Sequence, residues 1–288
     1  MSEPQGRKSQ ASPLDSLSPQ DMALACEAAG TTKAGRDAIA LLVLGILAGA
    51  FIALGAMFMT TVVTGAGDLP WGVARLIGGL VFSLGLILVI IGGAELFTGD
   101  TLMIVACASK RITVMSLLRA WALVYIGNII GAVGTALLVF LSGQHTFFNG
   151  AVGQTALTIA SAKAALPTLQ LFFLAVLCNV LVCLAVWMSL SARSTTDKVL
   201  VIIPPVAAFV TAGFEHSVAN LYFLPYALLI KGFATVDFWS DIGQSVSGYS
   251  ALAFAATAHN VIIATLGNLI GGSLLVGLVY WLVYLRGK

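Results

Sequence analysis

Long apolar stretches, separated by charged residues, run through this chain. Thirty uncharged residues lie between Asp37 and Asp68, and 19 lie between Arg75 and Glu95. A helix needs about 20 consecutive apolar residues to cross a bilayer. The pattern therefore predicts six membrane-spanning helices, at about residues 38–62, 76–94, 120–141, 164–192, 198–230 and 259–285.

Composition is typical of a protein that lies in lipid. Hydrophobic residues make up 59% of the 288 residues and charged residues only 9%, whereas an ordinary soluble domain has about 25% charged residues. The mean hydropathy is +1.01. The net charge of +2 is too small to indicate a nucleic-acid partner. The four cysteines form no Cys-x-x-Cys pair, so we expect buried free thiols and neither a metal ion nor a cofactor.

The polar and charged residues outside the spans divide the chain into three parts. Residues 1–19 are rich in Ser, Pro and Gln and predict a disordered tail. Residues 20–36 predict an amphipathic helix on the membrane surface or on the bundle, and residues 37–288 predict a six-helix transmembrane domain. With a cytoplasmic N-terminus, eleven of the 14 Lys and Arg residues fall in cytoplasmic segments. The positive-inside rule therefore places both termini in the cytoplasm.

The second and fifth predicted spans are interrupted. The second meets Ala-Glu-Leu-Phe-Thr-Gly-Asp at residues 94–100, and the fifth meets Phe-Glu-His-Ser-Val-Ala-Asn at residues 214–220. Each break places a glutamate near the bilayer centre, where a charge costs at least about 2.5–3.5 kcal/mol. Non-helical backbone at this depth must face a water-filled or protein-lined cavity.

The two breaks belong to an internal repeat. The break residues recur after 120 residues, and a Gly-Asn pair in the following span recurs after 140. Three spans per half is an odd number, so the two halves must have opposite orientations. Paired interrupted helices in inverted halves predict a transport site at the midplane. The repeated positions are Gly93, Glu95, Asp100 and Asn128 in the first half, and Gly213, Glu215, Asn220 and Asn268 in the second.

Each break also exposes the N-terminus of a half-helix, whose free N–H groups favour an anion. Carboxylates in the breaks would repel an anion, and neither break contains a Lys or Arg. We therefore expect the carboxylates to accept hydrogen bonds from the freed N–H groups, in preference to forming a cation site. The asparagines of the Gly-Asn pairs are expected to bond across helices. This structural role is assigned to Glu95, Asp100, Glu215, Asn220, Asn128 and Asn268.

His216 is the histidine that the pattern places at membrane depth, inside the second break. An ionisable residue there indicates a functional site, and imidazole exchanges a proton near neutral pH. No second histidine or carboxylate stands at a spacing suitable for zinc or haem. We therefore interpret His216 as a pathway residue.

The motifs around the breaks resemble the formate/nitrite transporter family, from about residue 20 to the C-terminus. Within that family, the supporting motifs are more similar to the bacterial formate channels than to the nitrite branch. Gly99-Asp100 differs from those formate channels and is nearer to nitrite and hydrosulfide relatives. The matching segments are Glu95-Leu-Phe-Thr98-Gly-Asp100, Gly213-Phe-Glu215-His216-Ser-Val-Ala-Asn220, Phe82-Ser-Leu-Gly-Leu86, Tyr125-Ile-Gly-Asn128, the stretch 179–189 and the stretch 277–286.

The resemblance implies an all-α protomer with an aquaporin-like fold, assembled as a homopentamer with one pore per subunit. It implies apolar constrictions on both sides of a central histidine. By position, the pathway residues would be Phe82, Leu86, Phe209, Thr98, Asn179, His216 and, in the outer vestibule, Lys163.

We expect a multi-pass protein of the bacterial inner membrane that passes formate in both directions, with pH-dependent and proton-coupled uptake. A full anion meets a steep desolvation penalty in an apolar constriction, whereas the neutral acid does not. The N-terminal helix is a candidate docking site for a cytoplasmic partner. Nitrite or hydrosulfide passage on the same scaffold is the nearest alternative. A water or glycerol channel would need an Asn-Pro-Ala motif, which the chain lacks, and a membrane enzyme or redox subunit would need metal or haem ligands.

Overall fold

A computed structural model describes residues 16–287, in which all regular structure is helical. Six helical stretches are long and apolar enough to cross a membrane, which confirms the predicted number of spans. The spans are α2 (Ala38–Val63), α3 (Trp71–Gly92), α6 (Val114–Leu141), α8 (Thr168–Ser191), α9 (Thr195–Ala212) and the continuous stretch of α12 (Phe254–Ile270), η5 (Gly271–Leu278) and α13 (Val279–Tyr284).

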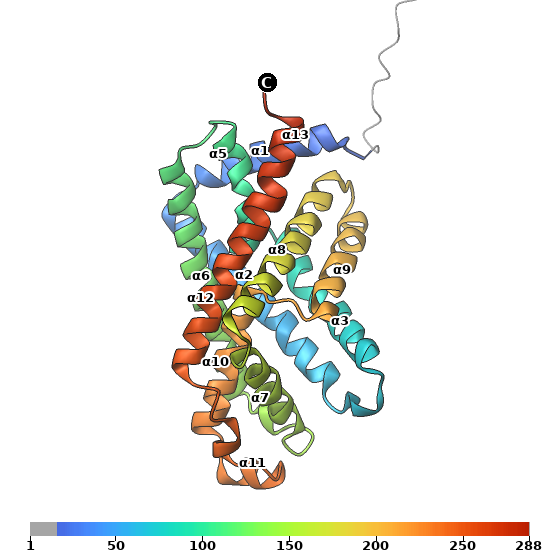
Figure 1. Ribbon diagram of the computed structural model, residues 1–288, viewed down its shortest axis with the longest axis vertical. Helices are drawn as coiled ribbons and strands as arrows, with labels where there is room; N and C mark the ends of the chain where they lie inside the picture. Colours follow the sequence, from blue (N-terminus) through green and yellow to red (C-terminus); the bar gives the residue numbers. More distant parts are fainter. Residues whose placement is uncertain (1–15, 288) are drawn as a thin grey trace, which may run out of the picture.

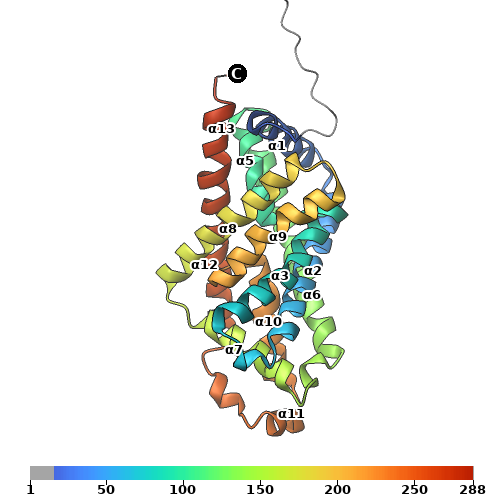
Figure 2. The same ribbon diagram turned by 90° about the vertical axis from the view of Figure 1, so that its right-hand side faces the viewer.

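The short helices cover the two ends of the bundle. At one end, called the proximal face here, α1 (Pro19–Ala34) lies across the bundle beside α5 (Ile104–Ala108) and α13 (Figures 1 and 2). At the opposite end, the distal face, lie α7 (Ala151–Ala164) and α11 (Val236–Asp241). The predicted tail falls mostly on residues 1–15, which lie outside the described residues.

The two halves of the chain run in opposite directions, as the repeat predicts. α2 runs from the proximal to the distal face, and its counterpart α8 runs from the distal to the proximal face (Figure 1). α3 and α9 both stop inside the bundle, where Gly93 and Gly213 adopt the left-handed conformation with φ of 75° and 77°. Glycine is favoured in this conformation because it has no Cβ. The chain then resumes as α4 (Phe97–Asp100), η2 (Thr101–Met103) and α5 in the first half, and as α10 (Ser217–Phe233) in the second.

Glycines let the span after each break approach its neighbour closely. A side chain at Gly131 of α6 would overlap the carbonyl oxygen of Ile46 in α2. Likewise, a side chain at Gly271 would overlap the carbonyl oxygen of Val176 in α8. Small residues are typical of such contacts between membrane helices. The close approach brings the asparagines next to the breaks.

Candidate functional site

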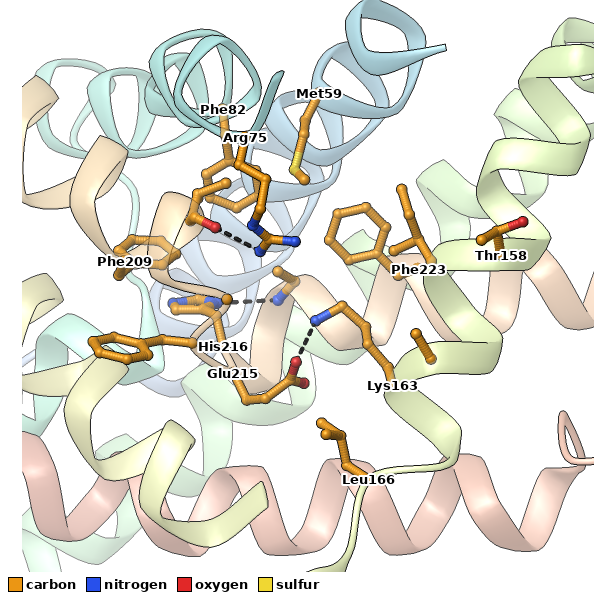
Figure 3. A pocket seen from close by; sticks show the side chains of 16 residues that line it. Met59, Arg75, Phe82, Thr158, Lys163, Leu166, Phe209, Glu215, His216 and Phe223 are labelled. Atoms are coloured by element: carbon orange, nitrogen blue, oxygen red, sulfur yellow. Dashed lines mark hydrogen bonds and ion pairs between the residues drawn. The ribbon is translucent and has the colours of Figure 1, made fainter. Parts of the chain in front are cut away.

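A cavity of about 350 Å³ lies on the distal side of the second break (Figure 3). α3, α7, α9 and α10 supply most of its wall. The apolar part of the lining includes Met59, Phe82, Phe209 and Phe223, and the charged or polar part consists of Arg75, Lys163, Glu215, His216 and Thr158.

Phe82 and Phe209, which the resemblance places at an apolar narrowing, lie together beside His216. The rings of Phe82 and Phe209 meet edge to face with centroids 5.8 Å apart. Phe209 stacks at 6.0 Å on the imidazole of His216. Leu86 lies one helical turn from Phe82 and is 3% exposed, but it does not line this cavity. The structure therefore brings Phe82 and Phe209 together at the cavity, and the prediction of Leu86 as a pathway residue stays a prediction.

His216 and Thr98 connect the two breaks. Oγ1 of Thr98 lies 2.9 Å from Nε2 of His216, although the residues are 118 positions apart. Nδ1 of His216 accepts a hydrogen bond from the backbone N–H of Ala219 at 3.1 Å, so His216 is the N-cap of α10. An acceptor at Nδ1 assigns the proton of neutral imidazole to Nε2. The Nε2–H therefore donates to Thr98, and the threonine hydroxyl keeps its own proton for another acceptor.

Asn179 of α8 holds the backbone of the first break through hydrogen bonds. Its Nδ2 donates to the carbonyl oxygens of Thr98 at 3.1 Å and Asn268 at 2.6 Å. The side chain is fully buried and does not line the distal cavity. A side chain at Gly272 would overlap both Thr101 and Asn179, so the glycine leaves room for this network. Asn179 thus positions Thr98, and its prediction as a pathway residue stays a prediction.

Two asparagines make the same three hydrogen bonds at the two breaks. Nδ2 of Asn128 donates to the carbonyl oxygens of Gly45 and Glu95, and its Oδ1 accepts from the backbone N–H of Phe97. Nδ2 of Asn268 donates to the carbonyl oxygens of Ala175 and Glu215, and its Oδ1 accepts from Ser217. Backbone groups that leave a helix at membrane depth need such partners. The asparagines therefore cap the half-helices.

The carboxylates of the breaks pair with cations, which corrects the prediction from sequence. Glu215 forms an ion pair with Lys163 at 2.8 Å and accepts a hydrogen bond from Asn220 at 2.7 Å. No backbone N–H freed by a break donates to these side chains among the described residues. The cations are Lys163 of α7, Lys33 of α1 and Arg36 just after α1, which all lie far from the breaks in sequence.

The first break shows the same arrangement on the proximal side. Lys33 of α1 reaches Glu95 at 2.6 Å and Asp100 at 2.5 Å, and Arg36 also pairs with Glu95. A small cavity of about 40 Å³ lies there, lined in part by Lys33, Gly99 and Asp100. α1 is thereby attached to the loop that carries Thr98.

The sequence alone does not place three cations, Lys33, Arg36 and Arg75, at this site. Lys33 and Arg36 contribute to the sequence interpretation only through the count of positive charges, and Arg75 only through that count and as a span boundary. The internal repeat could have indicated Lys33. Lys163 follows Lys33 by 130 residues, which lies between the repeat offsets of 120 and 140 residues, so the two lysines could occupy equivalent positions in the two halves. Arg75 has no counterpart of this kind.

Within residues 16–287, no three His, Cys, Asp or Glu side chains come together in a group that could hold a metal ion. Cys26, Cys107, Cys178 and Cys183 are free thiols. Burial raises the pKa of the Cys26 thiol, in α1, to about 12. Sγ of Cys183 donates to the carbonyl oxygen of Thr98 at 3.4 Å, so this thiol supports the first break together with Asn179.

Comparison with known proteins identifies the class of this chain. Residues 20–282 match the family described as "Formate/nitrite transporter". The chain is 44% identical to the formate channel FocA of Escherichia coli K12 over 275 residues, which cover 95% of this chain and 96% of that protein. It is 41% identical to FocA of Haemophilus influenzae, over 91% of this chain and 92% of that protein.

Solved structures agree with this result. The fold superposes on a "Pentameric formate channel with formate bound" with a TM-score of 0.83 and 46% identity, covering 86% of this chain and 98% of that one. An "FNT family ion channel" gives a TM-score of 0.78 at 30% identity, covering 91% of this chain and 98% of that one. The sequence, the six spans and the paired breaks together show that this chain is a membrane protein of the formate/nitrite transporter family.

Proposed function

We propose that this chain is a channel for formate and similar small monovalent anions in the bacterial inner membrane. It acts as a homopentamer with one pore per protomer and has no catalytic step of its own. The observation that carries the proposal is the contact between Thr98 and His216, which joins two half-helix N-termini beside an aromatic narrowing. Formate channels among the similar proteins support the choice of substrate.

The proposed orientation follows from the distribution of positive charge. The proximal face, which carries α1 and the end of α13, is cytoplasmic, and the distal face is extracytoplasmic. α1 is then a cytoplasmic helix, and the channel domain begins at residue 37, just before α2. The distal cavity with Arg75 and Lys163 is then the outer vestibule.

Passage of formate would use His216 as a hydrogen-bond donor and proton-exchanging group. In neutral imidazole the Nε2–H, and the hydroxyl of Thr98, are available to a carboxylate that enters between them. A second proton must go to Nδ1, where it displaces the hydrogen bond from Ala219. A nearby anion compensates for this loss by favouring the imidazolium. Transfer of the Nε2 proton then gives neutral formic acid, which crosses the apolar narrowing without the desolvation cost of an anion.

Flux measurements on proteoliposomes test this function. Purified protein would be assayed with formate, nitrite, hydrosulfide and chloride at two pH values. We expect formate flux well above that of empty liposomes and a clear pH dependence. Absence of protein-dependent formate flux would refute the proposal. Faster passage of nitrite or hydrosulfide would favour the alternative that Gly99-Asp100 indicates.

Loss of an aromatic ring at the narrowing is expected to loosen selectivity. Phe82→Ala and Phe209→Ala each remove half of an edge-to-face contact, so larger carboxylates should pass more easily while formate flux persists. The ratio of acetate flux to formate flux measures the effect, with Leu86→Ala as a comparison outside the cavity lining. Unchanged discrimination in both phenylalanine variants, with a normal pentamer, would contradict this prediction.

Removal of the N-terminal helix is expected to raise formate efflux or abolish its pH response. α1 covers the proximal side of the first break, and Lys33 holds it to Glu95 and Asp100. A chain lacking residues 1–33 would be compared with one lacking only residues 1–17, which keeps α1 intact. If the longer deletion gives a stable pentamer with normal flux, α1 is an anchor or a docking site for a cytoplasmic partner.

A further inference from the structure

The distal cavity contains two cations that differ in their surroundings. Lys163 forms an ion pair with Glu215, with 2.8 Å between Nζ and Oε1. Arg75 forms no direct ion pair within residues 16–287, and its hydrogen bonds go to backbone carbonyl oxygens. The charge of Lys163 is therefore largely neutralised, whereas Arg75 supplies the net positive charge of the cavity.

The guanidinium of Arg75 is held in place along one edge. Its Nε donates to Thr211 at 2.9 Å, and its Nη2 donates to Val210 at 2.7 Å. These carbonyls lie at the C-terminal end of α9, where the helix dipole favours a cation. The indole of Trp71 lies 5.0 Å from Cζ and supports the same position. The group is therefore fixed before any anion arrives.

The opposite edge of the guanidinium remains open. A guanidinium has five N–H groups, and protein acceptors occupy two of them. The three remaining N–H groups are the two on Nη1 and one on Nη2. One N–H from each of these nitrogens points the same way, and together they form a fork that fits two oxygens of a planar oxyanion. Figure 3 shows this end of Arg75 directed toward the interior between Met59 and Phe223. Apolar walls around such a charge strengthen its attraction for anions.

Together these features point to a recognition role. We propose that Arg75, rather than Lys163, is the residue that captures the anion in the distal cavity. Its open fork selects small planar anions that present two oxygens, such as formate and nitrite, over single-atom anions such as chloride. This inference rests on the proposed function and adds a specificity-determining residue to it. Lys163 has the different role of holding Glu215 at the break.

The test compares Arg75→Gln and Arg75→Lys with Lys231→Gln in right-side-out membrane vesicles, where added formate meets the distal face first. Lys231 is a matched control, because it also donates to two backbone carbonyls but lies outside the cavity lining. Formate uptake would be measured against formate concentration, and competition by nitrite and by chloride would be measured at one formate concentration.

Arg75→Gln should raise the formate concentration for half-maximal uptake by about tenfold or more, as expected for the loss of a charged donor. Arg75→Lys keeps the charge but not the fork, so the preference for nitrite over chloride as a competitor should fall by roughly tenfold. Lys231→Gln should behave as wild type. Arg75→Lys also provides the test if Arg75→Gln fails to assemble.

Two results would overturn the inference. One is a wild-type preference between nitrite and chloride in Arg75→Lys, which would show that the fork is not used. The other is an equal loss of affinity in Arg75→Gln and Lys231→Gln, which would indicate a general effect of surface charge. Failure of the proposed function is distinguishable from both, because wild-type vesicles would then take up no formate.

Discussion

His216→Asn is expected to abolish proton-coupled formate uptake at low pH while leaving downhill passage of the anion. Asparagine is a good N-cap, so it can accept the hydrogen bond from Ala219 that His216 now accepts. Its amide can also reach toward Thr98, but it cannot exchange a proton between pH 5 and 8. The fold should therefore persist, and the pH dependence of uptake should disappear.

The measurement is formate uptake by proteoliposomes with an imposed pH gradient, compared with uptake without one. Wild type should accumulate formate when the outside is acidic, and His216→Asn should only equilibrate it. His216→Phe should block the pathway, because a larger, wholly apolar ring would then stack on Phe209 and the Nε2–H donor would be lost. Normal pH dependence in His216→Asn would mean that the imidazole only orients the loop and the substrate.

Much of the architecture was predictable because a membrane imposes simple rules on sequence. The spans follow from apolar length, and the inversion of the halves follows from an odd number of spans per repeat. The break at Glu95 and the break at Glu215 were visible as polar segments inside apolar ones. Thr98 and His216 were both predicted as pathway residues from the resemblance, and the structure brings them into contact.

The electrostatic partners of the breaks were not predictable from local sequence. A carboxylate inside an apolar run reveals that it needs a partner, but not where that partner lies. Glu215 finds Lys163 across 52 positions and Glu95 finds Lys33 across 62. Arg75 joins the cavity because α3 packs against α9, which brings Arg75 beside the C-terminal end of α9. The positions of Lys163, Lys33 and Arg75 therefore depend on packing between segments that are distant in sequence.

The asparagines that cap the half-helices differ from ordinary polar residues between membrane helices. A hydrogen bond between two intact membrane helices is worth only about 0.6 kcal/mol on average, because lost partners are often replaced. Asn268 instead satisfies one N–H and two carbonyl groups of backbone. Ala175 lies within α8, but the N–H of Ser217 and the carbonyl of Glu215 are buried at the break and have no helical partner. Each such group left unsatisfied costs about 1–3 kcal/mol.

Asn268→Ala is therefore expected to destabilise the folded protomer by roughly 3 kcal/mol or more and to stop formate flux. Asn268→Asp retains the acceptor for Ser217 but places an oxygen against the carbonyls of Ala175 and Glu215, so it should be no better tolerated. Thermal unfolding of the detergent-solubilised pentamer measures the effect, and Asn128→Ala should match it because the first break makes the same three bonds. A pentamer of Asn268→Ala that unfolds within a few degrees of wild type and conducts formate normally would show that the loop after Gly213 is held by the Lys163–Glu215 pair instead.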